Sequence, residues 1–223
     1  MRSRKRFYRL FVFGGERVNE LERRFYDVEL ETREEQDMGV VIGRPIVYGQ
    51  VANIGMFDEV IMPGALDGAD LTDVRLCLNH DTSYVYARSR RNNPNSTMRL
   101  TPDQSGLMIE ADLNIKSSPK AQDYYSAIKR GDMDKMSFMF SVREDQWDNL
   151  DSDHPLRRIT KISNVVEVSA VTFPAYDSTE IDARSKEALE NARSAVETAR
   201  QQREQAVETA FELARLRAKI KSL

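Results

Sequence analysis

Hydrophobic and polar residues alternate along several segments of the chain, and the clearest alternation lies at residues 135–142. This segment reads Lys-Met-Ser-Phe-Met-Phe-Ser-Val. Successive side chains of a strand point to opposite faces of a sheet. Met136, Phe138 and Phe140 therefore share one face, whereas Ser137 lies on the other. The pattern predicts a half-buried strand that packs through one face and presents a hydroxyl group on the other.

Shorter runs with the same period predict further strands, separated by turn-forming residues. These runs lie at residues 24–30, 39–49, 57–61, 74–81, 97–100, 107–115, 158–162 and 165–171. Pro45 interrupts the second run, and a turn at 102–106 joins two of the runs into a β-hairpin. The polar segments 88–95 and 147–155 are typical of exposed loops. The chain is therefore expected to be rich in β-structure.

One helix is predicted between Ser118 and Gly131. The Ser118 hydroxyl can cap free N–H groups, and Pro119 lacks an N–H that the first turn does not need. Gly131 follows two basic residues and ends the helix. Its apolar stripe consists of Ala121, Tyr124, Tyr125 and Ile128.

The composition changes near Ile181. From Ala183 to the C-terminus there is no glycine or proline, and apolar residues follow alternating steps of three and four. This spacing predicts a long amphipathic helix. Its seam is rich in alanine and is broken by Arg203 and Arg217, which favours a helix that lies on a partner over a self-sufficient coiled coil.

Three regions are therefore expected along the chain. Residues 1–23 mix basic and aromatic residues and are predicted to form a flexible N-terminal arm. Residues 24–180 hold the β-rich domain, and residues 181–223 hold the amphipathic helix.

The composition narrows the functional classes. With 223 residues the chain can bury a substantial core, and its net charge of −3 provides no basic field for nucleic acid. Cys77 is the single cysteine, and His80 and His154 are the only histidines, so neither a disulfide nor a metal site is expected. The N-terminal apolar run is short and is broken by Arg9, unlike a signal peptide. We expect a soluble intracellular protein without cofactor or membrane association.

Three predicted strands carry a hydroxyl, an imidazole and a carboxylate. Ser137 lies in the first segment described, His80 near the end of 74–81, and Glu167 within the β-branched run 165–171. A serine becomes a strong nucleophile when an imidazole takes its proton and an acceptor orients the other ring nitrogen. These residues are the parts of a catalytic triad, although spacing alone does not bring them together.

Each of these residues also has a structural interpretation. A serine in an apolar strand is most often a small residue on a pleated surface, and a histidine at a strand end is most often a cap or a surface residue. A carboxylate at Glu167 is costly to bury unless it is paired. An ion pair with Arg157 or Arg158 explains it as well as catalysis does.

A series of short motifs extends from about Arg24 to Tyr176, which is most of the chain. In order, the motifs are Pro63-Gly64-Ala65, Asn79-His80-Asp81, Asp103 with Gly106-Leu107, Gly131, Met136-Ser137-Phe138, Phe140, Glu167-Val168-Ser169, Val171-Thr172 and Pro174-Ala175. Together they resemble the prohead maturation proteases of tailed bacteriophages, and several linked motifs are far more specific than any one of them.

This resemblance implies a fold similar to that of the herpesvirus assembly proteases, mostly β with helices around a small antiparallel β-barrel. It places the family's nucleophile at Ser137, its base at His80 and the third triad member at Glu167. The family usually has glycine where this chain has Met139, so the approach of a substrate backbone to this strand is expected to differ.

The resemblance also implies a biological role. It is that of a serine endopeptidase inside the assembling prohead, in the host cytoplasm, which cleaves scaffold protein, major capsid protein and itself. The helix at 181–223 would attach the enzyme to scaffold or shell, and a homodimer is left open. The alternative is a non-catalytic assembly or scaffolding module on the same barrel. A general cytosolic protease is less favoured, because nothing in the sequence suggests an ATPase or a secretion route.

Overall fold

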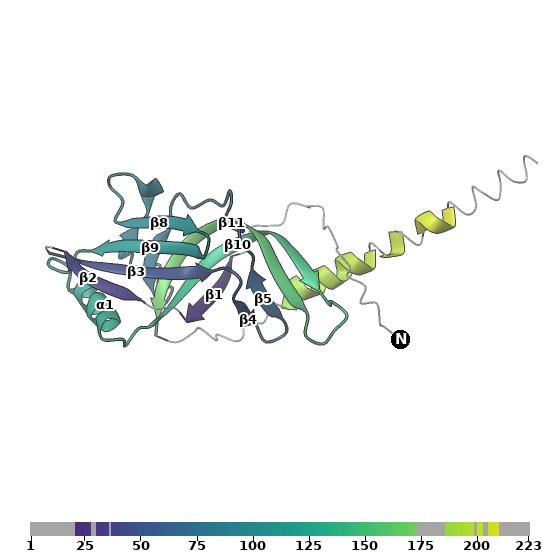
Figure 1. The fold of residues 1–223 in the computed structure, drawn as a ribbon, viewed down its shortest axis with the longest axis horizontal. Coiled ribbons are helices and arrows are strands. Elements are labelled where there is room, and N and C mark those ends of the chain that lie inside the picture. Colours follow the sequence, from purple (N-terminus) through teal and green to yellow (C-terminus); the bar gives the residue numbers. More distant parts are fainter. Residues whose placement is uncertain are drawn as a thin grey trace, which may run out of the picture.

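The computed structural model describes residues 21–27, 30–35, 37–172, 186–198, 200–202 and 205–209 (Figure 1). Its strands are β1 (Glu22–Asp27), β2 (Glu31–Glu35), β3 (Met38–Val47), β4 (Val51–Asn53), β5 (Asp58–Ile61), β6 (Arg75–Leu78), β7 (Ala87–Arg88), β8 (Met98–Asp103), β9 (Gly106–Leu113), β10 (Lys135–Asp148) and β11 (Leu156–Val171). The helices are the 3₁₀ turn η1 (Arg90–Asn92) and α1 (Pro119–Lys129). Residues 186–198, 200–202 and 205–209 are also helical. Most of the predicted N-terminal arm, residues 1–23, lies outside the described residues. The last two residues of that predicted arm, Glu22 and Arg23, belong instead to β1.

The strands form two sheets rather than the closed barrel that was expected. One sheet follows the order β1-β10-β11-β5-β4, with β6 and β7 branching from β11, and the other follows β2-β3-β9-β8. The branch arises because β11 is long enough for two partners: its first part pairs with β5 and its last part with β6, both in parallel. The pairings among the described residues therefore do not close a ring. One hydrophobic core is shared by both sheets and α1.

The longest hairpin is formed by β10 and β11. The sequence predicts a loop at 147–155, but β10 continues to Asp148, and the two runs at 158–162 and 165–171 belong to one strand. Packing explains the extension, because the Trp147 ring meets Phe57 edge to face at 4.9 Å and lies 5.8 Å from the guanidinium of Arg157.

The helix predicted at residues 118–131 is confirmed as α1. The Ser118 hydroxyl accepts a hydrogen bond from the Ala121 N–H at 3.3 Å, and Gly131 adopts a left-handed φ of +75° just beyond the helix. The buried face of α1 packs on the second sheet at Gly39, where an added Cβ would come within 2.6 Å of the Tyr125 ring. Glycine at this position lets the helix approach the strand closely.

Five charged side chains form a buried cluster that joins β1 to β5, β10 and β11. Arg24 donates to Glu59 at 2.5 Å, and Arg157 donates to Asp145 at 2.8 Å and to Glu59 at 3.0 Å. Glu22 accepts from both guanidinium groups, at 2.6 and 2.7 Å. Every charge in this cluster has an opposite partner, and deleting one member of such a group typically costs roughly 3–5 kcal/mol.

The helix at 186–198 contacts the tip of the β10–β11 hairpin, beside which it lies in Figure 1. Leu189 is buried, and the Arg193 guanidinium donates to the main-chain carbonyls of Leu150 and Ser152 at 3.3 and 3.2 Å. The predicted C-terminal helix is thus confirmed where the structure describes it, and its first turns are attached to the domain.

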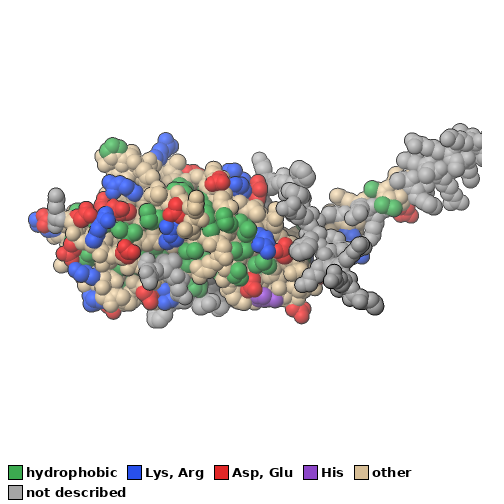
Figure 2. All heavy atoms as spheres, in the orientation of Figure 1, with side chains coloured by type: hydrophobic (Ala, Val, Ile, Leu, Met, Phe, Trp, Pro, Cys, Tyr) green, Lys and Arg blue, Asp and Glu red, His purple; other side chains and the backbone are tan. Residues whose placement is uncertain are grey.

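The surface mixes both signs of charge, with Lys and Arg interspersed among Asp and Glu over the face shown in Figure 2. Surface ion pairs such as Lys129 with Glu34, at 2.7 Å, illustrate this mixture. Among the described residues, no helix has the length and apolar character needed to cross a membrane.

The buried cluster predicts a loss of stability in acid. Burial alone would raise the pKa of Glu22, but Arg157 and Arg24 outweigh it and lower this pKa from 4.5 to about 2. Because the folded-state pKa lies below the unfolded value, the stabilisation is present above about pH 4.5 and disappears as the pH falls towards 2. The pKa difference corresponds to about 3 kcal/mol.

Urea unfolding at a series of pH values measures this contribution. We expect Glu22→Gln to be less stable than the parent at neutral pH and to lose less stability in acid, so that the two curves converge. Glu31→Gln, which removes an exposed carboxylate from β2, is the control and should follow the parent curve. Parallel curves for Glu22→Gln and the parent would contradict the assignment.

Candidate active site

His80 lies just beyond the end of β6, in a turn with unusual backbone geometry. Asn79 and His80 both adopt left-handed conformations, with φ of 49° and 61°. This region is sterically strained for residues other than glycine, although Asn and His tolerate it better than most. The Asn79 N–H bonds to the Ala170 carbonyl at 3.1 Å, and the Asn79 side chain accepts from the Thr172 N–H at 3.0 Å. The turn is therefore fixed to β11.

The β10–β11 register positions the other two predicted residues. Ser137 pairs with Ser169, and Met139 pairs with Glu167, in antiparallel strands. Residues directly opposite each other in such a pair lie on the same face. Ser137 and Glu167 therefore lie diagonally across two adjacent strands, on the same face of the sheet.

The structure brings the three predicted residues into a hydrogen-bonded row. His80 Nδ1 lies 2.6 Å from Glu167 Oε2, and His80 Nε2 lies 2.7 Å from Ser137 Oγ. The imidazole and carboxylate side chains are only 5% and 2% exposed, so their interaction is shielded from water. This geometry matches that of an activated serine nucleophile.

The structure does not show the alternative ion pair of Glu167 with Arg157 or Arg158. The Arg157 guanidinium is engaged by Glu22, Glu59 and Asp145, and Arg158 donates to Asp148 at 2.6 Å. The carboxylate at Glu167 instead contacts His80 and the hydroxyl of Ser169. In the sequence, Ser169 stands out only as part of a family motif, because a serine two residues after a glutamate gives no signal of its own.

The Ser137 hydroxyl has a second neighbour on β1. Its Oγ donates to the main-chain carbonyl of Arg24, at 2.8 Å. A hydroxyl has a single proton, so this carbonyl and His80 Nε2 compete for it. Proton transfer to the imidazole requires the hydroxyl to turn away from Arg24.

Of two other residues discussed from the sequence, Met139 lies close to this row and His154 does not. Met139, at the position where the family usually has glycine, is buried on the same face as Ser137. His154 lies in the β10–β11 loop, as predicted, where its Nε2 is 2.9 Å from Asp58 Oδ1. Among the described residues, no group of three or more His, Cys, Asp or Glu side chains is arranged to hold a metal ion.

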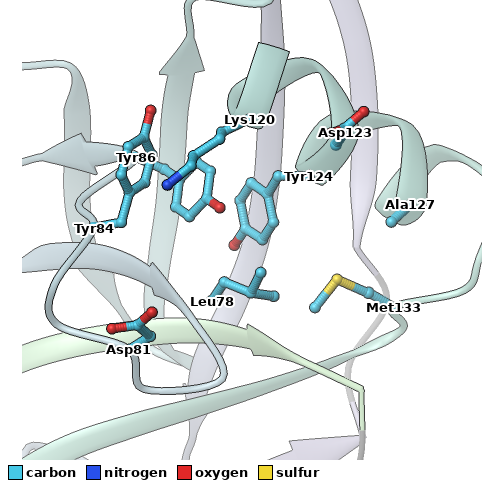
Figure 3. A pocket seen from close by; sticks show the side chains of 9 residues that line it. All are labelled: Leu78, Asp81, Tyr84, Tyr86, Lys120, Asp123, Tyr124, Ala127 and Met133. Carbon is cyan, nitrogen blue, oxygen red and sulfur yellow. The ribbon is translucent and has the colours of Figure 1, made fainter. Parts of the chain in front are cut away.

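A cavity of about 340 Å³ lies between α1 and the segment that follows His80 (Figure 3). Its walls are mainly aromatic and apolar, and its charged groups are two aspartates and a lysine. The lining residues are Leu78, Asp81, Tyr84, Tyr86, Lys120, Asp123, Tyr124, Ala127 and Met133. Tyr124 connects this cavity to the site, because its hydroxyl donates to the Cys77 carbonyl and accepts from the Ala170 N–H. Such walls suit an apolar or aromatic side chain.

Cys77 is fully buried and pairs with Ser169 in the β6–β11 register, yet it is a poor nucleophile. Burial, and then the nearby charge of Glu167, raise the pKa of its thiol to about 12. Because only the thiolate reacts efficiently, the row described above has no competing sulfur nucleophile at neutral pH.

This pKa predicts slow alkylation of Cys77 in the folded chain. A rise from 9.0 to about 12 lowers the thiolate fraction by roughly 10³-fold. Mass spectrometry after iodoacetamide treatment should find the thiol unmodified under native conditions and rapidly modified in urea. Equal rates in both conditions would refute the inertness of this thiol.

Comparison with known proteins adds independent evidence. A sequence model of the caudovirus prohead serine protease family matches residues 26–194, a range that contains His80, Ser137 and Glu167. No curated protein and no solved structure matches the chain. The match covers most of the chain and confirms the resemblance seen in its motifs. The chain therefore belongs to the caudovirus prohead serine protease family, the hydrolases of bacteriophage capsid maturation.

Proposed function

We propose that this protein is a serine endopeptidase in which Ser137 is the nucleophile, His80 the general base and Glu167 the third triad member. The observation that carries the proposal is the hydrogen-bonded row from Glu167 through His80 to Ser137, with distances of 2.6 and 2.7 Å. Family membership supports the reaction class, and the hydrogen-bonded row supports these roles.

The reaction follows from these roles. The Ser137 oxygen forms a bond to the carbonyl carbon of the substrate while its proton passes to Nε2 of His80. The peptide C–N bond then breaks, and the departing amine takes that proton, which leaves an ester on Ser137. Water attacks this ester while its proton passes to His80, the bond between the acyl carbon and the serine oxygen breaks, the serine oxygen takes that proton back, and the carboxylic acid product leaves.

Glu167 has an orienting and electrostatic role in this scheme. Its Oε2 lies 2.6 Å from Nδ1, which directs the Nδ1 proton towards the carboxylate and leaves Nε2 free to accept. The carboxylate also stabilises the imidazolium that forms during attack. Because both side chains are nearly excluded from water, this stabilisation is stronger than it would be at the surface.

We propose that the substrates are the scaffold protein and the major capsid protein of an assembling prohead in the host cell, and that the enzyme also cleaves itself. Membership of the prohead protease family favours capsid-related proteins as substrates. A relation in fold to the herpesvirus assembly proteases stays a prediction, as does a homodimer. The non-catalytic assembly module is less favoured, because such a module has no need for a buried hydroxyl–imidazole–carboxylate row.

We also propose that the outer part of the C-terminal helix binds scaffold or shell. The first turns are engaged with the domain through Leu189 and Arg193, whereas residues 205–209 are exposed and include Val207, an exposed apolar side chain. An exposed helix face beyond the contacts with the domain is suited to a partner groove.

Replacement of the nucleophile or the base tests the catalytic proposal. We expect Ser137→Ala and His80→Ala to lower the rate of peptide cleavage about 10³-fold or more, which corresponds to about 4 kcal/mol of barrier, while the fold persists. Mass spectrometry of the purified chain measures self-cleavage, and a serine-directed fluorophosphonate measures nucleophile reactivity.

Ser141→Ala is the matched control, because Ser141 is a buried serine on the same strand whose hydroxyl has no hydrogen-bond partner in the described structure. It should retain both activities. Shortened termini that persist in Ser137→Ala would favour the non-catalytic alternative, with the cleavage due to a contaminating protease.

Truncation tests the docking proposal. Deletion of residues 200–223 leaves Leu189 and Arg193 in place. We therefore expect the rate of reaction with a fluorophosphonate to change by less than about twofold. The unfolding temperature should change by only about a few degrees, as is usual for surface changes. Incorporation into proheads, measured by co-sedimentation after co-expression with scaffold and capsid proteins, should fall sharply. Unchanged incorporation would contradict the role of this helix.

A further inference from the structure

We propose that Ser169 is a positioning residue that holds both the backbone of His80 and the carboxylate of Glu167 for the reaction. This inference rests on the proposed triad and extends it to a fourth side chain. Ser169 lies on β11, directly opposite Ser137 in the β10–β11 register and two residues after Glu167. It is fully buried, so its hydroxyl must find its partners within the protein.

The hydrogen bonds of Ser169 can be assigned without ambiguity. The His80 main-chain N–H donates to Ser169 Oγ at 3.0 Å, because a backbone N–H can only donate. The single hydroxyl proton of Ser169 is then available for its other neighbour, and it is donated to Oε1 of Glu167. One hydroxyl thus accepts from the base residue and donates to the carboxylate that orients the base.

The bond to Glu167 determines which carboxylate oxygen faces the imidazole. With Oε1 occupied by the Ser169 hydroxyl, Oε2 is the oxygen that lies 2.6 Å from His80 Nδ1. A buried carboxylate without a second partner would be poorly satisfied and free to rotate about its terminal torsion. Ser169 therefore satisfies the carboxylate and fixes its plane.

The bond to His80 stabilises a strained turn. His80 and Asn79 are consecutive left-handed residues, a conformation that non-glycine residues keep only where the surrounding contacts enforce it. Asn79 is fixed through Ala170 and Thr172, whereas the N–H of His80 is held by Ser169. The same hydroxyl thus constrains His80 at its backbone directly and at its ring through Glu167.

Loss of this hydroxyl should affect the chemical step more than binding. We expect Ser169→Ala to lower the maximal inactivation rate by a fluorophosphonate roughly 10- to 100-fold, because small displacements of a catalytic group have effects of this size. The concentration for half-maximal inactivation should change by less than about twofold, since Ser169 is buried behind the triad. Ser169→Thr keeps the hydroxyl and should restore most of the rate.

A spectroscopic readout separates positioning from general stability. In proton NMR of the full chain, the Nδ1 proton shared by His80 and Glu167 should give a low-field resonance, which Ser169→Ala shifts or abolishes. The chain has only two histidines, so His154→Gln assigns the signal. Cys77→Ala is the matched control, because it removes a buried side chain from the register partner of Ser169 without touching these hydrogen bonds.

The outcomes distinguish this inference from the proposed function. An inactive Ser137→Ala together with a fully active Ser169→Ala of unchanged resonance would overturn the role of Ser169 and leave the triad intact. Activity in Ser137→Ala would overturn the triad itself. If Ser169→Ala merely unfolds at a lower temperature, with an unchanged rate per folded molecule, Ser169 is structural and the inference is wrong.

Discussion

The antiparallel pairing of β10 with β11 is the constraint on which the rest of the site depends. It places Ser137 opposite Ser169 and Met139 opposite Glu167, so that hydroxyl and carboxylate share one face. A slip of a single residue would turn every side chain of one strand to the opposite face. The apolar residues on the other side of β10, such as Phe138 and Phe140, are buried in the core and oppose that slip. The packing of the core therefore fixes which side chains share the face of Ser137, a face that is itself buried.

The buried ion cluster holds β1 against the other side of β10, away from β11. β1 is the neighbour of β10 on the side away from β11, and Arg24 and Glu22 connect it to Glu59 and Arg157. The main-chain carbonyl of Arg24 also touches the Ser137 hydroxyl. A single strand thus links the electrostatic cluster, the core and the Ser137 hydroxyl.

Much of the local structure could be predicted from the sequence, because alternation and capping act over a few residues. The strand around Ser137 and the capped helix α1 follow directly from such patterns. The extension of β10 through Trp147 could not be predicted, since it depends on contacts with Phe57 and Arg157. The branched sheet in place of a closed barrel depends on how the length of β11 is shared between β5 and β6.

In the candidate site, too, features with a local sequence pattern could be predicted, whereas contacts between distant segments could not. Ser137, His80 and Glu167 were predicted by residue type and by family motifs, and the structure brings them within hydrogen-bonding distance. The left-handed turn at Asn79-His80 and the two bonds of Ser169 were not predicted, because they join segments almost ninety residues apart and leave no local pattern. The charge cluster was missed for the same reason, as Arg157 gave no sign of its partners.

The position of β1 sets a limit on how far the chain can be shortened. The family match begins at residue 26, yet Glu22 and Arg24 precede it and neutralise buried charges of the domain. A recombinant fragment cut to the borders of that match would lose Glu22 and Arg24 and leave Arg157 with one acidic neighbour fewer. Amino-terminal shortening keeps the buried charge cluster complete only if it stops before Glu22.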